Sequence, residues 1–141
     1  MSVDQDIAYT SAISLLDLYA SRALSPVEAT RLLLDRLDTL QPKLNAFCIV
    51  DHDGALAAAR QSEQRWRRGE PAGQLDGVPV TIKDLMLMRN FPTLRGSRLV
   101  DPDQDWSEDA PAVARLREAG AVILGKTTTP EFGWKALGDS R

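Results

Sequence analysis

The amino-acid sequence predicts an α/β domain, in which helices alternate with short apolar strands. Three observations support this fold class. Apolar residues recur at helical spacing through residues 1–70, β-branched runs occupy residues 78–82 and 121–124, and a helical pattern with its own start and stop residues lies between those two runs. We therefore expect N-terminal helices over 1–70, followed over 75–141 by the first strands of a mixed sheet with covering helices.

The composition is that of one ordinary globular domain. The chain has 141 residues, 43% of them hydrophobic and 26% charged, and a formal net charge of −3. This charge provides no positive field for nucleic acid or an anionic membrane surface, so small or neutral partners are expected. No apolar stretch approaches the roughly 20 residues that cross a bilayer, and the first ten residues do not resemble a secretion signal, which favours a cytoplasmic protein.

Two helices are expected in the first part of the chain. Apolar residues recur at helical spacing after Ser11. The second helix has the clearest start in the chain, because Ser25 can cap it, Pro26 suits the first helical position and Glu28 completes a capping box. Pro42 is expected to stop this helix. Its apolar face contains Leu33, Leu37 and Leu40.

A short apolar strand at 45–50 and an alanine-rich helix from Asp53 to Gly69 come next. Cys48 lies in the apolar run, where a thiol usually behaves as a small hydrophobe, and as the only cysteine it excludes an internal disulfide and a multi-cysteine metal site. His52, the only histidine, is interpreted as a solvated turn residue rather than a catalytic or metal-binding group. The arginines of the last helical turn complement the helix dipole and are interpreted as solvated: Arg65, Arg67 and Arg68.

The pattern changes after residue 74. The pair Asp76-Gly77 indicates a turn, which leads into a β-branched strand over 78–82. A long irregular segment follows, and loops of such length often bind ligands. Asp109 can cap the helix after it, and residues 121–124 form a buried strand.

Residues 120–127, "GAVILGKT", match the phosphate-loop pattern of nucleotide-binding proteins. In those proteins the loop lies between a strand and the helix that follows it. Here the element before Gly120 is a helix, and the four residues after it would form a strand, so the order is reversed. We interpret Gly120 as the end of the helix and Gly125 as the break at the end of the strand, followed by a loop. The sequence therefore disfavours nucleotide binding.

Two lysines follow predicted strands. Lys83 comes after "VPVTI" and Lys126 after "AVILG". Sites in α/β domains gather beyond the carboxyl ends of strands, so both lysines are candidates for chemistry. Lys83 is the more unusual of the two, because it directly follows mostly apolar strand residues. The residues alone favour a structural role, in which the side chain extends to solvent or pairs with Asp84.

Several segments together resemble the N-terminal part of an amidase-signature enzyme. They are "LDGVPVTIKDL", "RGS" at 95–97 and "DAPAVARLREAGAVILGKTTTPEF", in the order and at the separation usual in that family, and the two helices before them also fit. The resemblance covers nearly all of the chain. One departure is Asn90-Phe91, where the family more often has a glycine before the proline-threonine pair. The resemblance therefore implies no particular substrate preference for this loop.

The resemblance implies hydrolysis of a carboxamide, or amide transfer in some members, by a serine nucleophile, a second serine on a cis peptide bond and a lysine. Lys83 in "VTIKD" matches the family's lysine and would accept the proton relayed through the second serine. A lysine is a base only as the neutral amine, which burial favours, and the apolar strand before Lys83 is consistent with burial. The implied partner is a small-molecule amide, with no cofactor and no metal, and a homodimer of the complete enzyme is left open.

In this family both serines lie downstream of 125–134, "GKTTTPEFGW", and this chain ends at Arg141. Ser140 has no glycine-rich context that would supply an oxyanion hole, so it is interpreted as a loop residue. We therefore expect an N-terminal fragment of an amidase-signature domain, which is inactive alone. Two alternatives stay open, a non-catalytic truncated remnant and an amidotransferase component similar to the A subunit of that branch. The loop after Lys83 favours the hydrolases.

Overall fold

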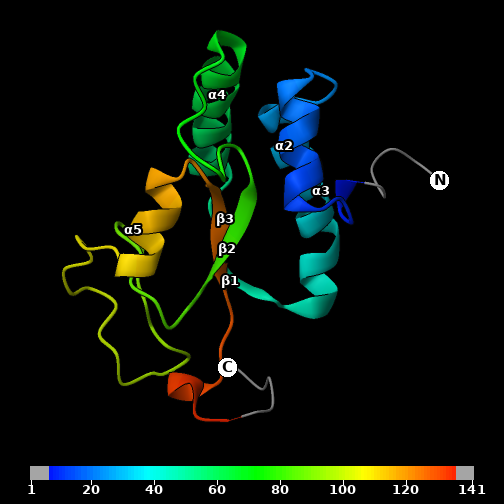
Figure 1. Cartoon of the computed structure of the whole chain (residues 1–141). Coiled ribbons are helices and arrows are strands. Elements are labelled where there is room, and N and C mark those ends of the chain that lie inside the picture. Colours follow the sequence, from blue (N-terminus) through cyan, green and yellow to red (C-terminus); the bar gives the residue numbers. More distant parts are fainter. Residues whose placement is uncertain (1–6, 136–141) are drawn as a thin grey trace.

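The computed structural model describes residues 7–135, and over this part of the chain it has the predicted mixed α/β architecture (Figure 1). With the labels of Figure 1, the elements are α2 (Ala12–Ala20), α3 (Pro26–Leu44), β1 (Phe47–Val50), α4 (His52–Arg68), β2 (Pro79–Lys83), α5 (Pro111–Glu118), β3 (Val122–Thr127) and the short 3-10 helix η1 (Glu131–Gly133). None of the helices described combines the length and the apolar composition that crossing a bilayer requires.

The strands form a sheet in the order β1-β3-β2. β2 is parallel to β3, whereas β1 is antiparallel to it. Because successive strand residues face opposite sides, β3 contributes to two cores. One core, shared with α3 and α4, contains Leu34, Ala55, Ala59, Val122 and Leu124. The other core, shared with β2 and α5, contains Ile82, Met88, Val113 and Ile123. The sheet therefore lies between two helical layers.

The start of α3 is the predicted capping box. The Ser25 hydroxyl accepts the Glu28 N–H at 3.1 Å, and the Ser25 N–H donates to Glu28 Oε2 at 2.8 Å. The prediction that Pro42 stops the helix is wrong, because α3 continues to Leu44. A proline in the last turn removes only one helical hydrogen bond, the one that its N–H would make to Asp38. Asp38 is exposed, so water can solvate that carbonyl group.

The start of α4 differs slightly from the prediction. The helix begins at His52 rather than at Asp53, because Asp51 caps it, and Asp51 Oδ1 accepts the Gly54 N–H at 2.9 Å. His52 is therefore the first helical residue and not a turn residue. Its Nε2 lies 2.9 Å from Asp38 Oδ1 on the partly exposed surface of α3. Gly69 ends the helix as predicted.

Arg65 corrects the interpretation of the arginine cluster as solvated. Its guanidinium donates to both carboxylate oxygens of Asp76, at 2.9 and 2.6 Å, and Asp76 is completely buried. Arg67 and Arg68 are exposed as predicted. The turn at Asp76 therefore packs back onto the end of α4, and this bidentate pair joins the N-terminal helices to the start of β2.

Cys48, which was interpreted as a small hydrophobe in an apolar run, is exposed. β1 is an edge strand of the described sheet, and its register shifts between Phe47 and Ile49. At this irregularity the Cys48 thiol points to the backbone of β3, where it lies 3.4 Å from the Lys126 carbonyl oxygen. The thiol is partly buried at this contact although the residue as a whole is exposed, and this partial burial, followed by the negative charge of Asp84, raises the pKa of the Cys48 thiol.

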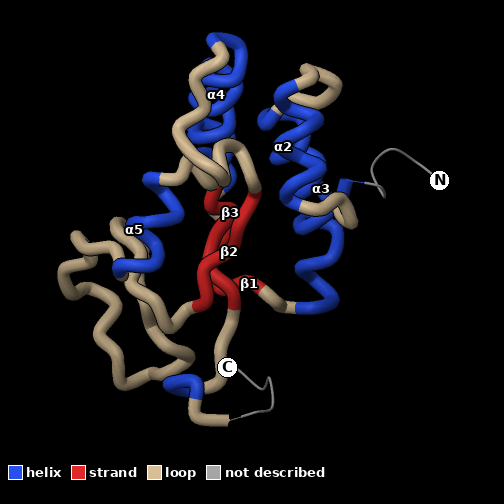
Figure 2. Tube along the Cα trace, viewed as in Figure 1, coloured by secondary structure: helices blue, strands red, loops and turns tan. Residues whose placement is uncertain are grey.

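A long loop joins β2 to α5, as the sequence predicts (Figure 2). Asp109 does not cap α5, because Ala110 occupies that position without a side-chain hydrogen bond. Instead, the Asp109 carboxylate accepts the Arg89 N–H at 2.8 Å and Arg117 Nε at 3.0 Å. Asp109 thus attaches the loop to α5.

Candidate functional site at the carboxyl ends of β2 and β3

The two lysines that the sequence singled out lie at the same edge of the sheet. β2 and β3 are parallel neighbours, so their carboxyl ends coincide, and Ile82 pairs with Lys126 while Lys83 pairs with Thr127. The ladder continues through the Asp84 N–H, which donates to the Thr127 carbonyl oxygen at 3.0 Å. This edge is where α/β domains place their sites.

A bulge at Gly125 decides where Lys126 points. The ladder pairs Val80 with Ile123 and then Ile82 with Lys126, so β3 has one more residue than β2 over this interval. Partners in a parallel ladder share a face, and Lys126 therefore lies on the face of Ile82 rather than on that of Val122. Gly125 lies within β3 and does not end it, which corrects the predicted strand boundary. The predicted helix end and strand across "GAVIL" are confirmed.

Lys126 is completely buried and its ammonium group has three partners. Nζ lies 2.8 Å from Asp84 Oδ1, and it donates to the Thr93 hydroxyl at 2.5 Å and to the Pro92 carbonyl oxygen at 2.8 Å. Burial lowers the pKa of Lys126, whereas the hydrogen bond and the charge of Asp84 oppose that effect. The ion pair between Lys126 and Asp84 is therefore a buried charged contact at this edge of the sheet.

The loop 92–97 is held across the edge by further contacts. The Arg95 N–H donates to Asp84 Oδ2 at 2.9 Å, and the Arg95 carbonyl oxygen accepts the Phe132 N–H at 2.8 Å. The Ser97 hydroxyl donates to Glu131 Oε1 at 2.7 Å. The loop is thus attached to β2 and to the segment after β3. The sequence does not reveal this network, and the one visible sign of it is a lysine followed by three threonines close after an apolar strand.

The side chain of Lys83 is exposed, and within residues 7–135 it takes part in no ion pair or hydrogen bond. The expectation of burial is wrong for this part of the chain, and so is the alternative pairing with Asp84. Extension of the side chain to solvent is confirmed. The physical reason is strand alternation, because Lys83 and Asp84 face opposite sides of β2 and only the side of Asp84 is covered by the loop.

Substitution of Gly125 by alanine is expected to disrupt this edge. A Cβ atom at Gly125 would lie 2.2 Å from the Ile49 carbonyl oxygen, and φ at this residue is +150°. The backbone of β1 or β3 would have to move, so we expect a loss of roughly 1–3 kcal/mol in the free energy of unfolding, measured by urea denaturation. Gly69→Ala is the control, because φ is also positive (+72°) but no atom lies within 4 Å. Equal losses in both variants would contradict the steric argument.

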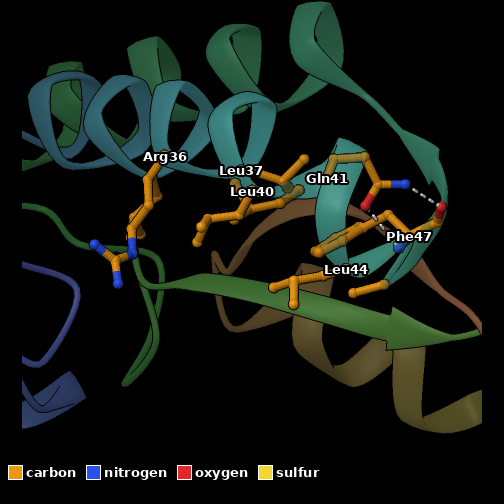
Figure 3. Close-up of a pocket in the computed structure, with 9 residues that line it drawn as sticks. Arg36, Leu37, Leu40, Gln41, Leu44 and Phe47 are labelled. Carbon is orange, nitrogen blue, oxygen red and sulfur yellow. Dashed lines mark hydrogen bonds between the residues drawn. The ribbon is translucent and has the colours of Figure 1, made fainter. Parts of the chain in front are cut away.

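A separate pocket of about 200 Å³ lies between α3 and the sheet (Figure 3). Its walls include the predicted apolar face of α3, Leu33, Leu37 and Leu40, together with Leu44 and Phe47. Gln41 closes one end through two hydrogen bonds to the Phe47 backbone, at 2.7 and 3.1 Å. The lining is almost entirely apolar and includes neither lysine, so the pocket offers no groups for bond cleavage.

Two other points concern the candidate residues. Ser140 lies outside the described residues. Over 7–135, no cluster of three or more histidine, cysteine, aspartate or glutamate side chains is arranged to hold a metal ion.

Comparison with known proteins shows that the chain is similar to amidases and to the A subunit of an amidotransferase. The family model named Amidase matches residues 28–140. The chain is 42% identical over 137 residues to the A subunit of glutamyl-tRNA(Gln) amidotransferase from Acidothermus cellulolyticus, an alignment that covers 96% of this chain and 26% of that protein. The chain thus spans about a quarter of the length of the curated relatives it matches.

Solved structures of two amidases contain the same fold as this chain. A bacterial aryl acylamidase of the amidase-signature enzymes superposes with a TM-score of 0.85 at 28% identity, covering 92% of this chain and 27% of that one. The peptide amidase from Stenotrophomonas maltophilia superposes with a TM-score of 0.79 at 32% identity, covering 87% of this chain and 25% of that one.

Proposed function

The chain belongs to the amidase family, and from that premise we propose that the protein cleaves a carboxamide C–N bond with Lys83 as the proton-transferring base. One observation carries the assignment to Lys83. Of the two lysines at the carboxyl edge of the sheet, Lys126 is buried and has three partners, whereas the Lys83 amine is accessible and has no partner over residues 7–135. Because Lys126 is held in its ion pair with Asp84, only Lys83 of the two has a side chain free to exchange a proton with a substrate.

The proposed reaction uses Lys83 as base and then as acid. A hydroxyl nucleophile attacks the carbonyl carbon while its proton passes to the neutral Lys83 amine, directly or through a second hydroxyl. When the tetrahedral intermediate collapses, the C–N bond breaks and the proton moves to the departing nitrogen. Water then releases the acyl group by the same steps. The resemblance assigns both hydroxyl groups to serines downstream of residue 134, so here only the lysine is assigned.

The experiment that tests this proposal is an amide hydrolysis assay with the purified intact protein. Aryl anilides and simple carboxamides are supplied, and free amine or ammonia is measured. We expect turnover that stops on treatment with a serine-directed phosphonate or sulfonyl fluoride. Absence of turnover on any amide, with the protein folded, would favour the alternative of a non-catalytic protein.

A second candidate function is supported by sequence similarity. The chain is 42% identical to proteins named as the A subunit of glutamyl-tRNA(Gln) amidotransferase, but only 28% and 32% identical to the two solved amidases described above. In this second function the protein supplies amide cleavage within a multi-subunit amidotransferase. Copurification of further subunits, together with amidation of glutamyl-tRNA(Gln) by the complex, would favour this function over free-standing hydrolysis.

A further inference from the structure

Arg95 lies in the loop at the carboxyl edge of the sheet, and its backbone is fixed on both sides. Its N–H donates to Oδ2 of the buried Asp84 at 2.9 Å, and its carbonyl oxygen accepts the Phe132 N–H at 2.8 Å. φ is +57° at Arg95 and +64° at Gly96, in the left-handed region that residues other than glycine rarely adopt. A Cβ atom at Gly96 would lie 2.4 Å from the Thr129 carbonyl oxygen, so the turn packs closely against the segment after β3. The position of Arg95 is therefore set by segments on both sides of it.

The Arg95 guanidinium has no partner in the part of the chain that the structure describes. The side chain is exposed, and over residues 7–135 it makes no ion pair or hydrogen bond. Acidic residues follow in the same long loop, at 101, 103, 105, 108 and 109, but none of them pairs with it. Left-handed backbone at a non-glycine residue costs free energy, and such residues are frequent where a loop binds a ligand. The loop thus presents a free guanidinium from a fixed position.

Arg95 and Lys83 lie on the two sides of one strand end. Asp84, which accepts the Arg95 N–H, directly follows Lys83 in the chain and faces the opposite side of β2. Burial lowers the pKa of Lys126 most, and the positive charge of Arg95 adds to that effect, so the guanidinium lies within electrostatic range of this edge. A small molecule that lies across the end of β2 therefore has one exposed cation on each side.

We propose that Arg95 is a substrate-binding residue, and that the substrate is an amide that also contains a carboxylate group. The inference rests on the proposed function, which places the amide at Lys83. A guanidinium binds both oxygens of a carboxylate through two parallel hydrogen bonds, a geometry that a lysine ammonium does not offer. With the carboxylate on Arg95, the amide lies toward the Lys83 side of β2. Arg95 therefore selects anionic amides over neutral ones.

The first test compares charged and uncharged amides with the intact protein. The monoamides of succinate, glutarate and adipate place a carboxylate at increasing distance from the amide, and their methyl esters have the same chain without the charge. Ammonia release gives kcat and KM. We expect one of the monoamides to be strongly preferred over its ester. Arg95→Met is expected to raise KM for that monoamide about 10- to 100-fold, as for the loss of a hydrogen bond to a charged group, with little change in kcat or in the rates of the esters.

Two controls separate the guanidinium from the fold of the loop. Arg95→Met keeps a side chain of similar length at φ +57° and both backbone hydrogen bonds, so it adds no backbone strain. Arg98→Met removes another exposed arginine of the loop, and its KM is expected to change less than about twofold because salt screens exposed charges that do not contact the substrate. Equal losses in both variants, or equal rates for monoamides and esters, would overturn the proposal.

The second test needs no turnover. Succinate, glutarate and adipate are titrated calorimetrically into the wild type and into Arg95→Met, with inorganic phosphate as a second oxyanion. We expect saturable binding of one dicarboxylate that is lost in Arg95→Met. Binding of this kind in a protein that hydrolyses no amide would refute the proposed function and leave the carboxylate site standing. Hydrolysis of neutral amides without binding of any dicarboxylate would refute this inference and leave the proposed function standing. Binding of phosphate in preference to every dicarboxylate would contradict the assignment of a carboxylate.

Discussion

Replacement of Lys83 by alanine in the intact protein is expected to lower kcat/KM for an amide by about 10²- to 10⁴-fold, the range that general acid–base catalysis typically contributes. The variant lacks the group that takes the proton from the nucleophile and returns it to the leaving nitrogen. Within residues 7–135 the Lys83 side chain makes no ion pair or hydrogen bond, so its removal breaks no such contact in this part of the chain.

Two further variants sharpen this prediction. Lys83→Arg is expected to be nearly as inactive as Lys83→Ala, because a guanidinium does not release its proton near neutral pH. Lys43→Ala removes an exposed lysine on α3 and is expected to retain wild-type kcat/KM. Measurement of initial rates across a substrate range decides the outcome. A Lys83→Arg variant with a near-wild-type rate would exclude the role of general base.

Substitution of Asp76 by alanine is expected to have the largest effect on stability. Asp76 accepts two hydrogen bonds from Arg65 and one from the Ala72 N–H at 2.8 Å, and its carboxylate is completely buried. Removal leaves the Arg65 guanidinium without its partner at the junction between α4 and β2. Breaking a buried pair in this way costs about 3–5 kcal/mol, against a typical domain stability of about 5–15 kcal/mol. Urea denaturation of the intact protein measures the difference.

Arg67→Ala is the matched control, because Arg67 ends the same helix but pairs with Glu63 on the exposed surface. Its expected effect is below about 1 kcal/mol, as is usual for exposed ion pairs. If Asp76→Ala were as stable as Arg67→Ala, the junction would not depend on the buried pair.

Acid is expected to weaken the stabilisation that the Arg65–Asp76 pair provides. Burial opposes ionisation of Asp76, but the hydrogen bonds from Arg65 and from the Ala72 N–H, with the charge of Arg65, outweigh it and hold the pKa of Asp76 below its ordinary value. A carboxyl whose pKa is lower in the folded state stabilises that state at neutral pH, and the contribution is lost as pH falls through the folded pKa. The stability difference between the wild type and Asp76→Ala is therefore expected to be full near pH 7 and to shrink in acid.

The sequence predicted most of the elements, because their determinants are local. Each signal affects only residues close to it in the chain, as do the capping box at Ser25, the cap glycine at Gly69 and the β-branched run before Lys83. The elements that these signals predict formed where they were expected. The boundary errors also had local causes. Pro42 was tolerated in a last helical turn, and the capping hydrogen bond of Asp51 started α4 one residue before the predicted Asp53.

What the sequence by itself determined is the fold class, the family resemblance and the presence of two lysines at strand ends. Which lysine is buried was decided only by the tertiary structure. One extra residue in β3 at Gly125 turns Lys126 toward Asp84, and strand alternation leaves Lys83 on the uncovered side. The burial of Arg65 against Asp76 depends in the same way on the turn that returns to α4. Burial and charge pairing depend on strand register and on contacts between segments that are distant in the chain. The spacing of residues within one segment therefore does not predict either of them.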